Sequence, residues 1–299
     1  MRVKESLPDR IFLIIVYAIM GLIALVCLYP FYYSIVISFN EGVDAMQGGI
    51  YFWPRAFTLE NYALVFSDTM IITAFLMTVL RTVVGTVAAL LFNSLFAYAL
   101  SRKSLIGRKW YIYIGMFTMY FWGGIIPLFL LIRTLGMLDS FWVYIIPNLS
   151  GFFTVLIFIA FYNELPASIL ESAKIDGANE WTIYLRIVLP ISTAVLATVA
   201  LFSGVAHWNS WIETHLYISD MRLQTMPYVL VRMINQGLAE EQLRASGQLL
   251  AFGATGGSTL TGNAVRMATM VVAVVPIMLI YPFLQRYFVK GIMLGAVKE

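Results

Sequence analysis

Apolar residues occur along the chain in six long runs that are separated by more polar stretches. A helix needs about 20 apolar residues to cross the hydrocarbon core of a bilayer, and each run is long enough. The six expected spans cover residues 11–38, 71–100, 110–132, 141–161, 191–216 and 265–286. Because no water satisfies backbone groups inside a bilayer, the runs predict an all-α polytopic membrane protein with six transmembrane helices.

The composition agrees with this prediction. Hydrophobic residues make up 61% of the 299 residues and charged residues 12%, whereas soluble domains carry roughly 25% charged residues. The net charge of +3 is small and gives no reason to expect nucleic acid as a partner. The single cysteine, Cys27, excludes an intrachain disulfide and a cysteine-based metal cluster.

The distribution of lysine and arginine predicts the orientation of the spans. Short loops on one side carry only Arg55 and Arg133, next to several acidic residues. Twelve basic residues flank the spans on the opposite side: Arg2, Lys4, Arg10, Arg102, Lys103, Arg108, Lys109, Lys174, Arg186, Arg286, Lys290 and Lys298. Since basic residues are enriched on the cytoplasmic side, both termini are expected in the cytoplasm. An even number of spans agrees.

The spans and loops are expected to form a single transmembrane domain over residues 1–299. Residues 162–190 form a cytoplasmic loop, and residues 287–299 form a cytoplasmic tail. Outside the membrane, residues 40–70 and 217–264 form two long segments. Loops of this length commonly have a function of their own.

The cytoplasmic loop 162–190 has the pattern of two short helices joined by a turn. Pro166 suits the first turn of a helix, and Gly177 permits the positive φ that ends it. A second helix is expected over residues 178–188. The exposed polar face would carry Glu171, Lys174 and Asp176. Such a projection suits a groove in a partner subunit, and an ordinary amphipathic loop at the lipid head groups is the open alternative.

This loop resembles the signature loop of bacterial ATP-binding-cassette (ABC) import permeases. The family pattern is Glu-Ala-Ala-x3-Gly-x9-Ile-x-Leu-Pro. All of its spacings are kept here, and Ser172 is the one departure. The resemblance implies that the loop seats a coupling helix in a nucleotide-binding subunit. The residues expected to couple transport to ATP hydrolysis are Glu171, Ser172, Ala173, Asp176, Gly177, Ile187, Leu189 and Pro190.

Other motifs narrow the resemblance to carbohydrate importers of the maltose type. Trp208-Asn209-x-Trp211 and the ending over residues 285–298 are similar to the MalG-like member of the permease pair. Four further motifs look like the LplC/YtcP branch, which serves complex oligosaccharides; they cover residues 29–31, 48–51, 59–62 and 97–102. The resemblance implies the type I importer fold. It also implies a heterodimer with a second permease, two ATP-binding subunits and an extracytoplasmic sugar-binding protein.

The chain carries no pattern for ATP hydrolysis or metal binding. Gly257-x4-Gly262 is followed by Asn263, where a phosphate-binding loop needs lysine. ATP and Mg²⁺ are therefore expected on the partner subunits, with no cofactor or catalytic site on this chain. His207 and His215 lack further ligands nearby, so no metal site is expected. Glu213 is interpreted as a polar residue at the outer mouth of a span.

Aromatic and polar residues within or beside the spans are candidates for contact with a sugar in transit. Aromatic faces with a few placed polar groups suit a sugar, although helix packing and interfacial belts use the same residues. The candidates are Trp208, Asn209, Trp211, Arg81, Tyr120 and Trp122. Arg81 and Arg266 either extend to the outer interface or face the aqueous path.

The sequence thus predicts a permease subunit in the bacterial cytoplasmic (inner) membrane that imports oligosaccharides. An acidic, uronate-containing substrate and a neutral one are both open. The tail from Lys290 to Glu299 is expected to dock on the ATPase subunits, and part of residues 217–264 is expected to reach the binding protein. The alternative is a membrane-embedded enzyme of lipid or polysaccharide metabolism, with a receptor or channel as a weaker rival.

Overall fold

The computed structural model describes residues 7–245 and 262–296. Among these residues the backbone is mostly helical and no strand occurs beyond one isolated bridge between Asn40 and Phe57. The chain divides into two compact units, residues 1–69 with 232–274, and residues 70–231 with 275–299. The predicted all-α class is confirmed. Arg2, Lys4, Gly256, Gly257 and Lys298 lie outside the described residues.

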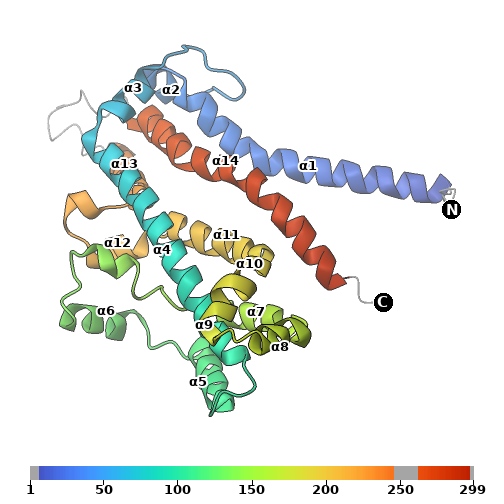
Figure 1. The fold of residues 1–299 in the computed structure, drawn as a ribbon. Coiled ribbons are helices and arrows are strands. Elements are labelled where there is room, and N and C mark those ends of the chain that lie inside the picture. The colour runs from blue at the N-terminus through green and yellow to red at the C-terminus, as the bar shows by residue number, and fades with distance from the viewer. Residues whose placement is uncertain (1–6, 246–261, 297–299) are drawn as a thin grey trace. The chain divides into compact units, whose positions relative to one another are not determined.

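Fourteen α-helices are present among the described residues (Figure 1). Their bounds are α1 Leu7–Ser38, α2 Gly42–Met46, α3 Glu60–Ser67, α4 Thr69–Ser101, α5 Arg108–Tyr120, α6 Ile125–Thr134, α7 Phe152–Asn163, α8 Ala167–Ile175, α9 Glu180–Ile183, α10 Leu189–Ile191, α11 Thr193–Asn209, α12 Ile212–Tyr217, α13 Met226–Ala245 and α14 Gly262–Ala296. Short 3-10 turns, η1 and η3, occupy Phe141–Tyr144 and Met221–Leu223, and a π-helical segment, η2, occupies Tyr184–Val188.

Three helical stretches are long and apolar enough to cross a membrane unbroken: Leu7–Ser38, Thr69–Ser101 and Gly262–Ile280. Three further spans are possible as bent pairs of helices. The bends are 115° between α5 and α6, 77° between α7 and α8, and 79° at the break between α10 and α11. Six spans are therefore compatible with the structure when each bent pair counts as one.

The middle spans differ from the unbroken runs that hydropathy predicts. The predicted third span is interrupted between α5, which ends at Tyr120, and α6, which begins at Ile125. Gly124 adopts a φ of 90° directly before α6. In the fourth, only the part from Phe152 is α-helical, because η1 and an irregular stretch precede it. The fifth separates at Ser210 into α11 and α12. Hydropathy averages over a window and does not register these changes of direction.

The sixth span also differs at its end, because α14 continues to Ala296. Residues 287–296, predicted as a separate tail, therefore extend the helix backbone instead of leaving it. Pro276 and Pro282 lie within α14 and do not end it. Gly291 and Gly295 lower the helix propensity by only about 1 kcal/mol each, which is insufficient to stop a helix of this length.

The first unit joins α1 to a folded segment over residues 40–68. Asn61 Nδ2 donates to the carbonyl oxygens of Ser38 and Asn40, at 2.9 and 2.8 Å. Asp44 accepts a hydrogen bond from Asn40 and forms an ion pair with Arg55 at 3.0 Å. These two partners, Asn40 first, hold the pKa of the Asp44 carboxyl below its ordinary value. The segment over residues 40–68 is thus a hydrogen-bonded structure rather than an open loop.

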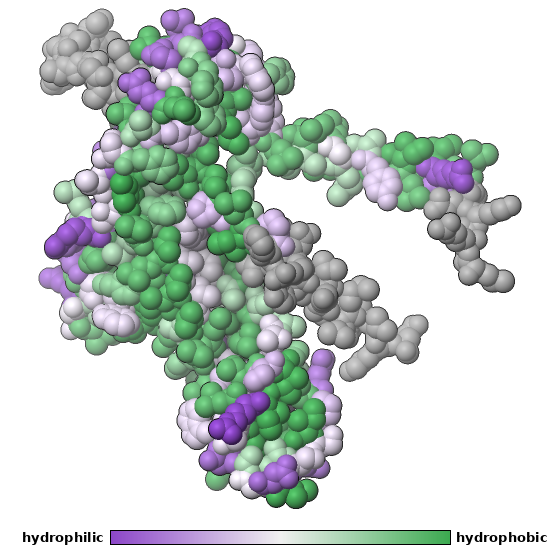
Figure 2. Space-filling model, turned by 45° about the horizontal axis from the view of Figure 1, so that its top comes forward, coloured by the Kyte–Doolittle hydropathy of each residue, from purple (hydrophilic) through white to green (hydrophobic). Residues whose placement is uncertain are grey.

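In the second unit, α4 is the long central helix (Figure 1). Its core cluster includes Ala97, Val155, Phe158, Ile183 and Val188, so α4, α7 and the helices of the predicted coupling loop share one core. Polar residues gather in small patches on a surface that is otherwise largely hydrophobic (Figure 2). Such a surface suits a lipid environment.

Candidate functional site

The predicted coupling loop folds as two helices joined by a glycine turn. Helix α8 ends at Ile175, and Gly177 follows with φ of 79°. The Ala178 N–H donates to the Ala173 carbonyl at 2.9 Å, and the Gly177 N–H to the Lys174 carbonyl at 3.0 Å. This pair of bonds is a Schellman motif, which requires a left-handed residue at the glycine position. The predicted glycine turn is confirmed.

The exposed face of α8 is charged, as the sequence predicts. Glu171, Lys174 and Asp176 are exposed, and Ala173 is buried in the core shared with α4 and α7. Ser172 is exposed as well. Ala173 therefore fixes α8 to the rest of the unit while its neighbours are presented outward.

An ion pair and a hydrogen bond attach the turn to α4. Lys174 Nζ lies 2.9 Å from Glu180 Oε1, across the turn, and Tyr98 of α4 donates its hydroxyl to Glu180 Oε2 at 2.6 Å. Beyond Glu180 the chain forms the π-helical segment Tyr184–Val188, followed by Leu189 and Pro190. Ile187 and Leu189 are half-buried against the core, and Pro190 is exposed.

The sequence reasoning missed this π-helical segment. One signal was present, because Pro190 has no N–H and cannot complete an α-helical bond to the carbonyl four residues earlier. A π segment often marks a functional site. Here it forms the last turn before the chain enters the fifth span.

Arg81 lies inside the unit instead of extending to the membrane surface. Only 1% of its side chain is exposed. Its Nη1 donates to the Ser210 carbonyl at 2.9 Å, and its Nη2 lies 3.1 Å from Glu213 Oε2. The second contact is an ion pair by distance that lacks the geometry of a directed hydrogen bond. The guanidinium also lies 4.5 Å from the ring centre of Tyr144.

Further hydrogen bonds surround the pair of Arg81 and Glu213. Glu213 accepts hydrogen bonds from Asn148 at 3.2 Å and from the Ser210 hydroxyl. Tyr144 in turn donates to the Leu223 carbonyl at 2.7 Å and contacts Thr214 at 2.9 Å. On sequence alone, Glu213 is interpreted only as a polar residue at the outer mouth of a span, and its pairing with Arg81 is not predicted. The sequence did carry a signal for this pair, because an arginine and a glutamate that both lie in apolar runs are expected to pair with each other.

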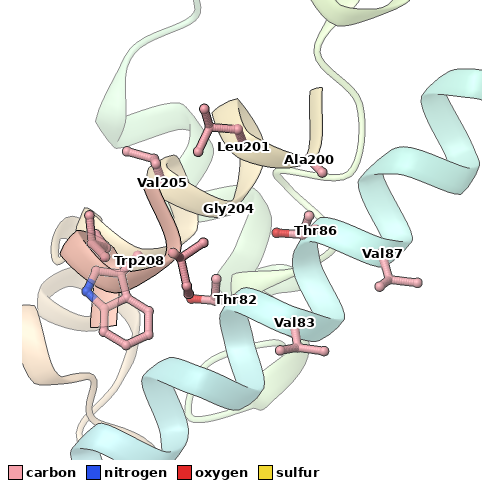
Figure 3. A pocket seen from close by; sticks show the side chains of 11 residues that line it. Thr82, Val83, Thr86, Val87, Ala200, Leu201, Gly204, Val205 and Trp208 are labelled. Atoms are coloured by element: carbon pink, nitrogen blue, oxygen red, sulfur yellow. The ribbon is translucent and has the colours of Figure 1, made fainter. Parts of the chain in front are cut away.

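Trp208 lines a cavity of about 310 Å³ together with residues of α4, α11 and α14. The hydroxyl oxygens of Thr82 and Thr86 point from α4 toward α11 (Figure 3). Both oxygens are buried and lack a hydrogen-bond partner within the described part of the chain. Gly204 lies opposite, and a Cβ added there would be 3.6 Å from Thr86 Oγ1. The cavity lining is thus mainly apolar and includes Trp208, while the hydroxyl oxygens of Thr82 and Thr86 are buried beside it.

The remaining candidates do not line this cavity. Asn209 is exposed at the end of α11, and the Trp211 ring centre lies 5.8 Å from that of His215. Tyr120 and Trp122 are 89% and 70% exposed at the break between α5 and α6. Of the six residues predicted along the path, Arg81 and Trp208 are therefore the two that lie buried among α4 and α11.

Arg266 is half-buried and bonds to backbone carbonyls. Its Nε donates to the Gly262 carbonyl at 2.9 Å, and its Nη1 to the Met233 carbonyl at 3.5 Å. A side chain at Gly237 would collide with the guanidinium. Arg266 therefore joins α13 to α14 on the two sides of residues 246–261.

Comparisons with known proteins agree with this architecture. Residues 82–294 match the family described as "Binding-protein-dependent transport system inner membrane component". The chain is 36% identical to the polygalacturonan/rhamnogalacturonan transport system permease protein YtcP of Bacillus subtilis, over 98% of this chain and 100% of that protein. It is 34% identical to protein LplC of the same organism, over 93% and 92% of the two chains.

Among solved structures, a bacterial ABC transporter involved in import of the acidic polysaccharide alginate matches with a TM-score of 0.85 and 29% identity. The match covers 96% of this chain and 99% of that one. The resemblance to maltose-type permeases is confirmed, as is the type I importer fold. The chain therefore belongs to the family of binding-protein-dependent transport system inner membrane components, the multi-pass permease subunits of ABC importers in the bacterial inner membrane, which are not enzymes.

Proposed function

We propose that this chain imports oligosaccharides derived from an acidic, uronate-containing polysaccharide. The observation that carries the proposal is the near full-length match to two proteins whose names specify such substrates, polygalacturonan or rhamnogalacturonan for one and alginate for the other. A membrane-embedded enzyme is not favoured, because the family consists of transport components.

In this proposal the chain pairs with a second, similar permease and two ATP-binding subunits that hold ATP and Mg²⁺. An extracytoplasmic binding protein delivers the oligosaccharide. The exposed charged face of α8 seats in a groove of one ATP-binding subunit, with Glu171 and Asp176 facing that partner. Closure of the ATP-binding subunits then moves α8, and the contacts of Glu180 with Lys174 and Tyr98 carry this movement to α4.

The cavity beside Trp208 is proposed as part of the sugar path. In this proposal the Trp208 side chain contacts a pyranose ring. The hydroxyls of Thr82 and Thr86, which are buried, reach the sugar when α4 and α11 move apart during transport. Its volume of about 310 Å³ is at the lower end for small-molecule sites, which are roughly 300–1,000 Å³. Arg81 does not supply the selectivity for uronates in this scheme, because Glu213 compensates its charge. The binding protein and the sister permease then select the acidic sugar.

The proposal is tested by uptake into vesicles that contain the complete importer and its binding protein. Trigalacturonate and a neutral trisaccharide of similar size are supplied in turn, with and without ATP in the vesicle lumen. Uptake of trigalacturonate that depends on ATP, and exceeds uptake of the neutral sugar at least tenfold, is the expected result. Preferred uptake of the neutral sugar would refute the acidic substrate and leave the importer assignment in place.

A further inference from the structure

A second cavity, of about 510 Å³, lies where α4 ends and the predicted coupling loop begins its second helix. Residues from α4, from the connection after it, and from Glu180, Trp181 and Tyr184 line this cavity. None of the predicted coupling or path residues is among them. The cavity therefore lies beside the predicted coupling loop, to which Glu180, Trp181 and Tyr184 belong, and it shares no lining residue with the cavity beside Trp208.

One part of the lining is positively charged and short of hydrogen bonds. Arg102 follows α4 directly, and its guanidinium carbon lies 4.3 Å from the ring centre of Tyr98. Its Nε is buried and has no hydrogen-bond partner among the described residues. Ser104 adds a hydroxyl to the lining. A buried donor without a partner is costly, so a ligand that accepts its hydrogen bond would be stabilised here.

The Glu180 carboxylate in the cavity lining already has partners within the protein. Glu180 binds Lys174 through one oxygen and the Tyr98 hydroxyl through the other. The Glu180 charge interacts with both Lys174 and Arg102, so one carboxylate faces two cations and a net positive charge remains at this place. Lys103 follows Arg102 in the chain and adds a second positive charge at this end of α4. An anion is the ligand that these charges favour.

Other residues of the lining are apolar and exposed. Leu95, Ile106 and Trp181 line the cavity and are 36%, 92% and 61% exposed. Arg102 follows directly on an apolar helix of 33 residues, and the charge pattern assigns this end to the cytoplasmic leaflet. The lining thus offers both charged and exposed apolar side chains, and a phospholipid carries a charged head group and apolar chains.

We propose that this cavity binds an anionic phospholipid of the inner leaflet. The phosphodiester oxygens accept hydrogen bonds from Arg102 and the Ser104 hydroxyl. The acyl chains lie along Leu95, Ile106 and Trp181. Because Tyr98 contacts both Arg102 and Glu180, an occupied site holds α4 against the start of the second coupling-loop helix. The assembled importer then requires an anionic membrane at this position.

Quenching of tryptophan fluorescence by brominated lipids tests the proposal at Trp181. The importer is reconstituted in phosphatidylcholine discs that contain a fixed fraction of brominated phosphatidylglycerol or brominated phosphatidylcholine. The Trp181→Phe variant isolates the signal of this residue from that of the other tryptophans. We expect an enrichment of phosphatidylglycerol near Trp181 of roughly fivefold, the factor that one basic residue contributes at a membrane surface. Arg102→Gln should abolish the preference, and Arg186→Gln, an exposed charge outside the cavity, should retain it.

Four results would overturn the proposal. Equal quenching by both lipids, or a preference that survives Arg102→Gln, would remove the anion site. Absence of quenching by either lipid would mean that a protein subunit covers the cavity. In a second arm, inorganic phosphate is titrated calorimetrically into discs of pure phosphatidylcholine. Saturable binding that Arg102→Gln abolishes would assign the site to a soluble anion instead of a lipid.

Discussion

Arg81 Nη2 and Glu213 Oε2 lie 3.1 Å apart, in a pair that joins α4 to α12 within the second unit. The guanidinium is almost fully buried and the carboxylate partly so. Water solvates these two charges less than it would solvate a pair at the surface. Each charge is therefore stabilised mainly by the other.

This dependence predicts unequal effects of single and double substitutions. Arg81→Gln leaves the Glu213 carboxylate without its cation, and Glu213→Gln leaves Arg81 uncompensated. Loss of one partner of a buried pair costs about 3–5 kcal/mol, so both single variants should lower the apparent melting temperature in detergent. The double variant should recover much of the loss, because two amides remain that can hydrogen-bond. A double variant as unstable as the sum of both singles would argue against the pair.

The same pair makes a prediction for substrate choice. Since Glu213 compensates Arg81, the arginine is not available as a fork for a uronate carboxylate. Arg81→Gln should therefore reduce uptake of acidic and neutral oligosaccharides by the same factor. Selective loss of the acidic substrate, measured in the same vesicles at matched protein content, would instead place Arg81 in contact with the sugar.

The turn at Gly177 predicts a defect in coupling that is separable from stability. A side chain at φ of 79° is strained by about 1–2 kcal/mol, although open space surrounds the position. Gly136 provides a matched control, since its φ is 67° and a Cβ there also meets nothing within 4 Å. Gly177→Asp and Gly136→Asp should lose similar stability, but only Gly177→Asp should hydrolyse ATP without transport or lose the ATP-binding subunit. Normal uptake by Gly177→Asp would contradict the coupling role.

Alanine substitutions at Gly85 of α4 and Gly204 of α11 should have different effects on stability. A Cβ at Gly85 would lie 2.6 Å from the His207 ring, which is buried and cannot easily move. Gly85→Ala should therefore destabilise the protein by about 1–3 kcal/mol through overpacking. At Gly204 the nearest atom is 3.6 Å away, so Gly204→Ala should have a melting temperature close to that of the native chain. Equal melting temperatures for the two variants would contradict the packing around His207.

The hydroxyls of Thr82 and Thr86 predict a loss of transport without a loss of stability. Replacing a buried hydroxyl that lacks a partner by a methyl group is nearly neutral or stabilising. The double variant Thr82→Val/Thr86→Val should thus keep its melting temperature and import sugar several-fold more slowly. Thr198→Val serves as the control, because that hydroxyl bonds to the Ala194 carbonyl of its own helix. Unchanged uptake by the double variant would remove these hydroxyls from the sugar path.

Local patterns in the sequence were sufficient for several features. The continuous apolar helices α1, α4 and the first part of α14 were predicted because span length and hydropathy are local properties. The left-handed turn at Gly177 was predicted because a helix end needs a positive φ that glycine adopts without strain. Exposure of Glu171, Lys174 and Asp176 followed from the same short pattern.

Other features depended on which parts of the chain meet. Arg81 bonds to the carbonyl of Ser210, 129 residues away, and no local pattern connects the two. Hydropathy also predicted unbroken third, fourth and fifth spans. It did not predict the break before Gly124, the irregular stretch before Phe152, the break at Ser210 or the π segment before Leu189. Neighbouring residues alone are enough to specify the apolar helices and the glycine turn, because span length and a positive φ are local properties. The partner of Arg81 and the places where helices change direction depend on packing, because only packing brings distant segments of the chain together.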